Sequence, residues 1–576
     1  MGKRKNITIA LIILSLLILA ACGGDDNHDP PQVDAAPLAL ADVLEIAHQQ
    51  RLGIHKPDYN VLLEMTQGRQ PLTWQQLESY GFVADYQAVF RSWVMSENIP
   101  VEVAISDFRR LFANLRYANG VDGSEILLPV LEAILEEIAI HEHTISRLHL
   151  NDIVNAHLPN ILDRFFMAVT VEEATADIHE FFAILRHVYG GYLYFGGDEI
   201  FEPIKEQILA QIANFEQDIP INILEEILFS HLAEVIVDAH FSIGSRHFTR
   251  PVFFYYRPGL KYDRGEASFR NRDSGQYVAE VAGHDKNELF RLAVDADGDF
   301  FYTPILMLHE EKTVSMLTII YKDGSESVPI LRRHNTDFRP FQEVSLRFIE
   351  GVPVVTVMRM GFTGHDNSSG VECARAFLGF APYLRDEAVV ILDLRGNRGG
   401  NGILGQRWLY ALTGEVVPTN YIILNAREFV PGQFQTDPNN NFHDLPREVH
   451  HIRYARAFEG YTLVSAHPDR LVPRDNGQKL IVLVDRGTGS AGEAMTDVMF
   501  NLENTLIIGQ NTTGVLAFDL TYPQPNLHLP RSGIPFGLGR AMFLWPEGHF
   551  AEGVGIAPDV WAVGDALTAA LAMLRN

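Results

Sequence analysis

The spacing of apolar residues changes along the chain and divides it into parts. Over residues 38–240 apolar positions recur every three or four residues, as in Ile221–Val237, which is typical of helices. A cluster of glycines and aromatic residues, Tyr189–Gly197, interrupts this pattern and predicts a turn packed with aromatic side chains. Over residues 241–340 apolar and polar positions alternate between turn signals, as in Thr313–Pro329, which is typical of strands and hairpins. We therefore expect a helical N-terminal domain followed by a β-rich insert.

Over residues 341–576 the pattern alternates between short strands and helices. The predicted strands are Val352–Met358, Ala388–Leu394, Lys479–Asp485 and Thr505–Gly509, and the predicted helices are Gly370–Leu384, Ala491–Asn501 and Asp565–Leu574. Such alternation indicates an α/β layered sheet with parallel strand pairs. Reactive groups in such sheets gather where strands end and helices begin, so these junctions are where we expect the chemistry.

The first 37 residues carry the pattern of an export signal and a tether. Three positive residues precede the apolar run Ile7–Leu19, which is too short to span a bilayer comfortably. The following Leu19-Ala20-Ala21-Cys22 resembles the bacterial lipobox, which implies cleavage after residues 1–21 and lipid attachment to Cys22. Residues 22–37 are rich in Gly, Asp and Pro and predict a flexible tether. We therefore expect a protein of the bacterial cell envelope, lipid-anchored to the membrane on the exported side.

Composition excludes several classes of function. Of 576 residues, 47% are hydrophobic and 21% charged, which is close to the average for folded globular proteins. The net charge of −27 would repel the backbone of a nucleic acid, so a nucleic-acid partner is not expected. Only Cys22 and Cys373 are present, which excludes a disulfide framework and a cysteine zinc site. No motif for a metal or a cofactor emerges.

Two strand-to-helix junctions carry candidate chemistry. The segment Gly487–Gly492 contains G-x-G-x-x-G, but the next strand runs into Gln510 and Asn511 instead of the acidic residue that a dinucleotide site needs, so nucleotide binding is a distant alternative. Ser490 in this turn is either a helix N-cap or a nucleophile held at the start of a helix. The second junction, Asp393–Asn401, also ends a strand in a glycine turn and supplies a further set of backbone amides.

Both junctions resemble motifs of the C-terminal processing (tail-specific) serine peptidases. Asp393–Gly400 is similar to D-x-R-x-N-x-G-G, and Ser490–Glu493 is similar to S-A-x-E. The resemblance implies a catalytic domain over residues 341–576 built as a crotonase-like spiral of β-β-α units, with Ser490 as nucleophile. It also implies oxyanion donors in the amides of Ala491 and of Gly399 or Gly400. The PDZ domain common in this family is not recognisable, so the insert is either a diverged PDZ-like domain or unrelated.

A departure from the motifs selects a branch of the family. One branch has a lysine base 25 residues after the serine, where this chain has Val515. The tricorn core protease-like branch uses an upstream histidine and a glutamate near the C-terminus. Asp238-Ala239-His240 resembles the upstream segment, and Glu552–Asp559 resembles the E-G-x-G-x-x-P-D segment. The resemblance implies His240 as general base and Glu552 as the carboxylate that orients it and raises its pKa. The family's serine before the histidine is Ala239 here, and Asp238 is the candidate substitute.

The sequence therefore predicts a lipid-anchored serine peptidase that cleaves exported polypeptides through an acyl-enzyme. The alternative is a catalytically inactive relative that binds a peptide or an apolar ligand, as the interphotoreceptor retinoid-binding protein modules of this fold imply.

Overall fold

The computed structural model describes residues 38–54, parts of 98–156, and 168–575 apart from short gaps at 266–267, 334–343, 361–367, 427–453, 459–460, 466–471, 473–476, 520–526 and 540. Residues 37–576 form one compact unit, separate from residues 1–36. The predicted signal peptide, the tether and Cys22 lie outside the described residues. None of the described helices is both long and apolar enough to cross a membrane.

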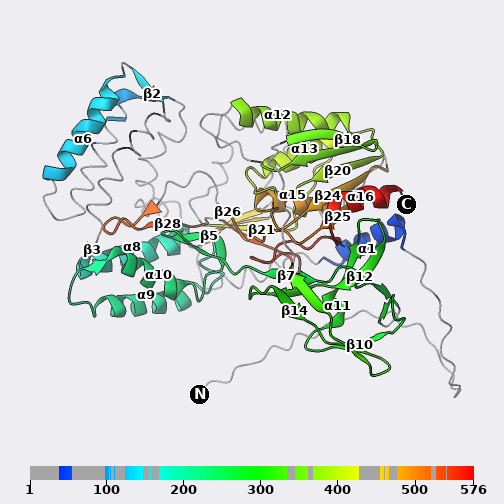
Figure 1. Cartoon of the computed structure of the whole chain (residues 1–576). Coiled ribbons are helices and arrows are strands. Elements are labelled where there is room, and N and C mark those ends of the chain that lie inside the picture. The colour runs from blue at the N-terminus through cyan, green and yellow to red at the C-terminus, as the bar shows by residue number, and fades with distance from the viewer. Residues whose placement is uncertain are drawn as a thin grey trace. The chain divides into compact units, whose positions relative to one another are not determined.

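A ten-stranded mixed sheet forms the centre of this unit (Figure 1). Its strands, in spatial order, are β18 (Val344–Ile349), β19 (Val352–Val357), β20 (Val389–Asp393), β24 (Lys479–Val484), β25 (Thr505–Gly509), β30 (Val560–Ala562), β11 (Phe290–Val294), β12 (Phe300–Pro304), β8 (Tyr262–Arg264) and β9 (Phe269–Asn271). The strands from β19 through β30 to β11 are parallel neighbours, and the remaining pairs are antiparallel. The α/β class predicted from the sequence is confirmed, and the predicted strand bounds agree to within one residue at each end.

Helices cover both faces of the sheet. Strands β19, β20, β24 and β25 advance in one direction across the sheet. Right-handed crossovers then place the intervening helices on one face. These helices are α12 (Ser368–Tyr383), α13 (Ile403–Thr413) and α15 (Ala491–Met499). The opposite face is covered by α1 (Leu40–Leu52) and α16 (Ala566–Arg575).

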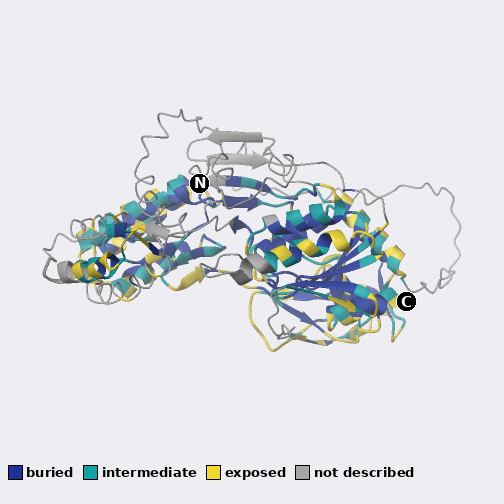
Figure 2. Cartoon of the chain, turned by 90° about the horizontal axis from the view of Figure 1, so that it is seen from above, coloured by how far each residue is buried: buried dark blue, intermediate teal, exposed yellow. Residues whose placement is uncertain are grey.

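The alternation of side chains along the strands explains this arrangement. On β24, Leu480 and Val482 pack toward α13 and α15, whereas Ile481 and Leu483 pack toward α16. All four side chains are fully buried, and burying each contributes roughly 1.5–3 kcal/mol relative to exposure. The strands of the central sheet are accordingly dark in the burial view of Figure 2.

Helix α1 belongs to this core although the sequence analysis assigned it to the helical domain. Its buried Val43 and Ala47 join the apolar cluster under β25 and α16. Arg51 at its end donates to Asp559 at 2.5 Å, and both side chains are 3% exposed. Asp559 also accepts from the amide of Ile507 at 2.7 Å. Asp559 is therefore a structural anchor between α1 and the sheet.

The β-rich segment continues the central sheet. Its strand β11 pairs in parallel with β30, and β12, β8 and β9 follow outward. Phe290, Leu292 and Val294 of β11 are buried, which gives this strand the apolar side chains of an interior strand. Two smaller sheets complete the segment. The first contains β13 (Leu306–Leu308), β7 (Phe253–Tyr256), β17 (Ile330–Arg333) and β14 (Val314–Met316), and the second contains β10 (Val278–Val281), β15 (Ile319–Tyr321) and β16 (Glu326–Ser327). The short helix α11 (Lys286–Leu289) precedes β11. The predicted hairpin around residues 322–324 is present as β15 and β16.

The helical segment contains α6 (Ser124–Ala139), α8 (Val171–Val188), α9 (Asp198–Ile212) and α10 (Ile221–Leu232). Two short strand pairs belong to it. In one, β1 (Asn98–Pro100) pairs with β2 (Thr144–Ser146), and in the other, β3 (Ala168–Val169) pairs with β4 (Ile219–Pro220). The predicted helix over Ile221–Val237 ends earlier, because the chain turns at residues 233–235 to enter β5 (Asp238–Ile243). Residues 190–197 form the predicted turn, and Tyr189 and Tyr192 beside it are buried.

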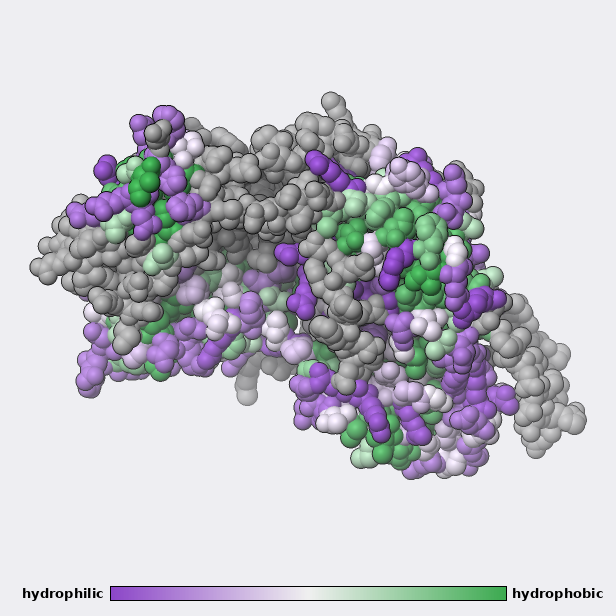
Figure 3. All heavy atoms as spheres, turned by 45° about the horizontal axis from the view of Figure 1, so that its top comes forward, coloured by the Kyte–Doolittle hydropathy of each residue, from purple (hydrophilic) through white to green (hydrophobic). Residues whose placement is uncertain are grey.

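Two sheets that the sequence did not predict connect these parts. One contains β27 (Leu527–His528), β28 (Pro535–Gly537), β5 and β6 (Arg246–Phe248), and the other contains β22 (Tyr454–Phe458), β23 (Tyr461–Ser465), β21 (Ile422–Ala426), β29 (Ala541–Leu544) and β26 (Phe518–Asp519). Strand β5 therefore pairs with a strand from the C-terminal third of the chain. In the view of Figure 3 the described surface is largely hydrophilic, with hydrophobic residues in smaller groups, which is consistent with the strongly acidic composition.

Candidate active site

Ser490 lies in a strained turn between β24 and α15. Its backbone has φ 51° and ψ −117°, a conformation that side chains other than glycine rarely adopt. A serine held this way on a strand-to-helix turn has the geometry of a nucleophile elbow. The amide of Glu493 donates to the backbone oxygen of Ser490 at 2.8 Å, and the Ser490 side chain makes no capping hydrogen bond. The hydroxyl is therefore not used to cap the helix.

The buried carboxylate of Glu493 fixes this turn. It accepts from the amide of Ser490 at 3.0 Å and from the amide of Val515 at 2.9 Å. Its other oxygen accepts from the Thr512 hydroxyl at 2.6 Å and the Gly514 amide at 2.7 Å. Burial raises the pKa of Glu493, whereas these four hydrogen bonds lower it. No role is predicted for Glu493 from the sequence, although the spacing S-x-x-E, the signature of a capping box, could have indicated one.

The second glycine turn lies against Ser490. The amide of Gly489 donates to the backbone oxygen of Asn397 at 2.8 Å, which joins the two junctions. Gly399 has φ +96°, and a Cβ there would lie 2.7 Å from the Cβ of Ser490. Only glycine allows this approach, because real Cβ atoms do not come this close.

Of the three predicted oxyanion donors, one already has an acceptor. The amide of Gly399 donates to Oδ1 of Asn397 at 2.9 Å, and Asn397 is held by its own bond to the Val357 carbonyl. The amides of Gly400 and Ala491 donate to no group within the described part of the chain. The arrangement therefore favours Gly400 over Gly399 as the partner of Ala491.

The charged residues of the same motif are structural. Arg395 donates two hydrogen bonds to Asp393, at 2.7 and 2.6 Å, and a third to Asp565 at 2.8 Å. Asp565 also accepts from the amide of Thr568 at the start of α16. A bidentate buried pair of this kind fixes the direction in which the chain leaves β20.

His240 lies on β5 and is held through its main chain. Its amide donates to Asp238 Oδ1 at 2.7 Å, while the buried Nδ1 of its ring has no partner among the described residues. Burial lowers the pKa of His240 to about 4, and the charge of His247 lowers it further. From the sequence, a carboxylate on the ring is expected to raise this pKa. The structure gives the opposite direction because the ring is desolvated without such a partner.

Glu552 contacts the strand that carries His240 and not the imidazole. One carboxylate oxygen accepts from the amide of Ala239 and the other from the amide of Ala517, each at 2.9 Å. Burial raises the pKa of Glu552 well above its ordinary value, and the nearby charge of Asp238 raises it further. Glu552 is thus a positioning group for the main chain on either side of the site.

Asp238 is fully buried beneath His240. It accepts from the hydroxyl of Tyr189 at 3.0 Å in addition to the amide of His240. Burial raises the pKa of Asp238 to about 7, although these hydrogen bonds oppose the shift. Tyr189 comes from the aromatic turn of the helical segment, and its role could not be found from the sequence because no local motif marks it.

The segment from Thr512 to Ala517 bonds to both Glu493 and Glu552. Val515 bonds to Glu493 beside the nucleophile, and Ala517 bonds to Glu552 beside β5. A Cβ on Gly489 would lie 3.0 Å from Cγ2 of Val515, so an apolar side chain occupies the place next to the Ser490 turn. Backbone hydrogen bonds of this segment therefore connect the turn of Ser490 to the strand that carries His240.

Arg486 connects the loop that contains Thr512 to the loop that contains Gly553 and Val554. Its guanidinium donates to the carbonyl oxygens of Thr512, of Gly553 at 3.1 Å and of Val554 at 2.9 Å. Burial without a carboxylate partner lowers its pKa to about 10. No cluster of His, Cys, Asp or Glu within the described ranges is arranged to hold a metal ion.

Residues 384–562 match the model of peptidase family S41. This range contains both glycine junctions, Ser490 and Glu552, and β5 with His240 lies before it. Among solved structures, mature CPAF complexed with lactacystin is 14% identical with a TM-score of 0.35, over 70% of this chain and 99% of that chain. The photosystem II D1 C-terminal processing protease is 15% identical with a TM-score of 0.33, over 70% and 96% of the two chains. A lipoprotein from Streptococcus agalactiae is 12% identical with a TM-score of 0.31, over 70% and 96%.

A search of curated protein sequences finds no match. The family match covers the two motifs from which the sequence resemblance was drawn and the turn that holds the nucleophile. Residues 384–562 therefore carry a peptidase family S41 domain, and the chain is a hydrolase of the serine type.

Proposed function

We propose that this peptidase cleaves exported polypeptides with Ser490 as nucleophile and His240 as general base, in a core of the crotonase-like type. The observation that carries the proposal is the turn of Ser490. Its positive φ leaves the hydroxyl uncapped, and the uncommitted amides of Gly400 and Ala491 lie in the two joined turns. This combination has the parts needed for acyl transfer.

The proposed reaction begins with attack of Ser490 Oγ on the carbonyl carbon of the scissile peptide bond. His240 is neutral at physiological pH, because burial lowers its pKa to about 4, and it accepts the proton of the hydroxyl. The negative charge on the carbonyl oxygen is stabilised by the N–H groups of Gly400 and Ala491. His240 then returns the proton to the leaving amine, and an acyl-enzyme forms on Ser490. Water activated by the same imidazole releases the acid product.

Glu552 and Asp238 act in this scheme through the main chain. Glu552 holds the amide of Ala239, and Asp238 holds the amide of His240, so that two consecutive peptide units before the imidazole are fixed. A fixed backbone limits the positions of the imidazole, which supports a productive approach to Ser490.

The alternative function is that of an inactive relative that binds a peptide or an apolar ligand. Two observations favour it: Val515 stands where one branch of the family has its lysine base, and Nδ1 of His240 has no partner in the described structure. An inactive relative would not activate the Ser490 hydroxyl, which makes reactivity of this serine the discriminating property.

The test is covalent labelling with a fluorophosphonate together with hydrolysis of an unfolded protein substrate. The parent should label and cleave, and Ser490→Ala should lose both, since loss of the nucleophile in other serine proteases costs about 10⁶-fold in turnover. The control is Ser230→Ala on the outer surface of α10, which should behave like the parent. A parent that neither labels nor cleaves would support the inactive relative.

We also propose that residues 1–21 are removed as a lipoprotein signal peptide and that Cys22 carries the membrane anchor. The support is the order of charged, apolar and small residues before this cysteine. Radiolabelled palmitate should be incorporated by the parent and not by Cys22→Ala. Equal incorporation in the two would place the lipid elsewhere.

A further inference from the structure

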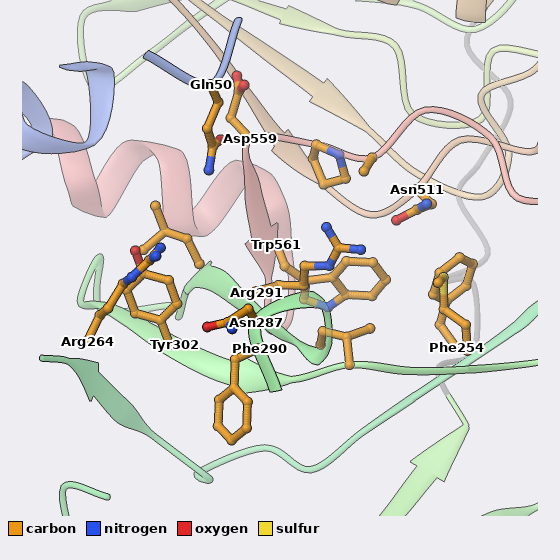
Figure 4. Close-up of a pocket in the computed structure, with 15 residues that line it drawn as sticks. Gln50, Phe254, Arg264, Asn287, Phe290, Arg291, Tyr302, Asn511, Asp559 and Trp561 are labelled. Carbon is orange, nitrogen blue, oxygen red and sulfur yellow. The ribbon is translucent and has the colours of Figure 1, made fainter. Parts of the chain in front are cut away.

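A cavity of about 130 Å³ lies away from the residues assigned to catalysis. Its walls come from α1, from β8, β11, β12 and β30 of the central sheet, and from the loop that contains Asn511 (Figure 4). Neither Ser490, His240 nor Glu552 lines it. The cavity therefore needs an explanation other than peptide hydrolysis.

Two guanidinium groups without a counter-ion line this cavity. Arg264 contributes from β8 and Arg291 from β11, and neither makes a hydrogen bond or an ion pair in the part of the chain that the structure describes. Arg264 lies over the ring of Tyr302, with its Cζ 5.9 Å from the ring centroid. Burial lowers the pKa of Arg291, and the charge of Glu288 only partly opposes this.

Two other cations of the same β-rich segment have the acidic partners that Arg264 and Arg291 lack. Lys261 pairs with Asp295 and Asp299, and Arg272 pairs with Asp263 and Asp299. The chain also carries 73 acidic residues against 46 Lys and Arg, so counter-ions are abundant. Both arginines are exposed, so an anion from solvent can reach them, and both line one cavity without an acidic partner in the described structure.

A third donor and an apolar surface belong to the same cavity. Trp561 on β30 is 2% exposed, and its indole N–H has no acceptor among the described residues. Phe254, Leu292 and Ile305 supply apolar walls. Asp559 also lines the cavity, but its charge is neutralised by the ion pair with Arg51.

We propose that this cavity binds a carboxylate attached to a small apolar body. The planar fork of an arginine matches the two oxygens of a carboxylate, and the apolar walls accept the rest of the ligand. An apolar cavity of about 150 Å³ in another protein holds one benzene molecule, so a body of roughly that size fits here. The apolar walls favour a carboxylate over inorganic phosphate, which has no apolar part.

The test compares phenylacetate with phenylacetamide, which share shape and differ in charge. Binding to the Ser490→Ala protein is measured by isothermal titration calorimetry, so that the reaction of the nucleophile plays no part. Phenylacetate should bind at least tenfold more tightly than the amide. The double variant Arg264→Gln/Arg291→Gln should lose at least tenfold in affinity, whereas Arg332→Gln, an exposed arginine of the same segment outside the cavity, should not.

Circular dichroism and the thermal midpoint establish that each variant is folded. The proposal is overturned if the amide binds as tightly as the acid, or if the double variant keeps the parent affinity. Competition by inorganic phosphate at equal concentration would also overturn it, because an unspecific anion site would then account for the binding.

Discussion

Glu552 accepts a hydrogen bond from the amide of Ala239, the residue that precedes His240, at 2.9 Å. The second carboxylate oxygen accepts from Ala517, two residues after Val515. Val515 in turn donates to Glu493, which holds Ser490. Two buried carboxylates thus connect the strand of the base to the turn of the nucleophile through backbone amides. Because backbone atoms carry this connection, it depends on the two acids and not on the side chains between them.

Replacing Glu552 by Gln should reduce activity through this connection. A glutamine offers one oxygen and one NH₂ group, so one of the two amides faces another donor. An unsatisfied buried donor costs about 1–3 kcal/mol, which corresponds to roughly a tenfold to hundredfold loss if it displaces His240. We expect kcat for peptide hydrolysis to fall with little change in KM. Glu547→Gln, on the exposed turn before it, is the control and should leave both constants unchanged. An equal fall of kcat in both variants would show that Glu552 does not act through this connection.

Replacing Gly399 by Ala should damage the site, because there is no room for a side chain beside Ser490. The added Cβ would meet the Cβ of Ser490 at 2.7 Å, and the residue would keep a positive φ. We expect lost fluorophosphonate labelling together with a thermal midpoint several degrees lower. Gly379→Ala in α12 is the matched control, since a Cβ there meets nothing within 4 Å and alanine favours a helix. If both variants label like the parent, the close approach of the two turns is not required.

The sequence predicts those parts of the fold that depend on local patterns. The strands β20, β24 and β25 are predicted correctly because buried parallel strands consist of short apolar runs, which here lie between glycine turns. The site residues in the two glycine junctions are found for a similar reason, because strained turns demand glycine at fixed positions.

Contacts between distant segments could not be predicted in this way. The pairing of β11 with β30 joins residues about 270 positions apart, and the apolar pattern of neither strand indicates which strand it pairs with. The same limit explains why Glu552 was assigned to the ring of His240, whereas its hydrogen bonds go to the amides of Ala239 and Ala517. It also explains why Tyr189, from another part of the chain, was not connected with Asp238.

The pH dependence of labelling should report the desolvated state of His240. A base must be neutral to accept a proton, and the pKa of His240 is lowered to about 4 by burial. We therefore expect the labelling rate to stay high as the pH falls from 7 to 5 and to decrease through about 4. The rate is measured with a fluorophosphonate over pH 3.5–8 in the folded protein. A midpoint at or above the ordinary histidine value of about 6.5 would show that a carboxylate pairs with the imidazole in solution.

The buried Asp238 should make the stability of the protein depend on pH. Its folded pKa is raised to about 7 by burial, whereas its unfolded value is about 3.9. A raised folded pKa gives stability that is fully present below the unfolded pKa and is lost as the pH rises through about 7. The contribution of Asp238 to the free energy of unfolding should therefore fall between pH 5 and pH 8, by up to a few kcal/mol.

Asp238→Asn tests this contribution, because asparagine does not titrate. As the pH is raised from 5 to 8, the free energy of unfolding, measured by urea denaturation, should fall less in Asp238→Asn than in the parent, or should rise. Glu552, whose pKa is raised, and His240, whose pKa is lowered, contribute in opposite directions and are present in both proteins, so the comparison isolates Asp238. Asp218→Asn on an exposed loop is the control and should show the full fall of the parent. If Asp238→Asn and the parent lose the same free energy over this range, Asp238 is ionised in the folded protein well below pH 7, and its hydrogen bonds with Tyr189 and His240 outweigh its burial.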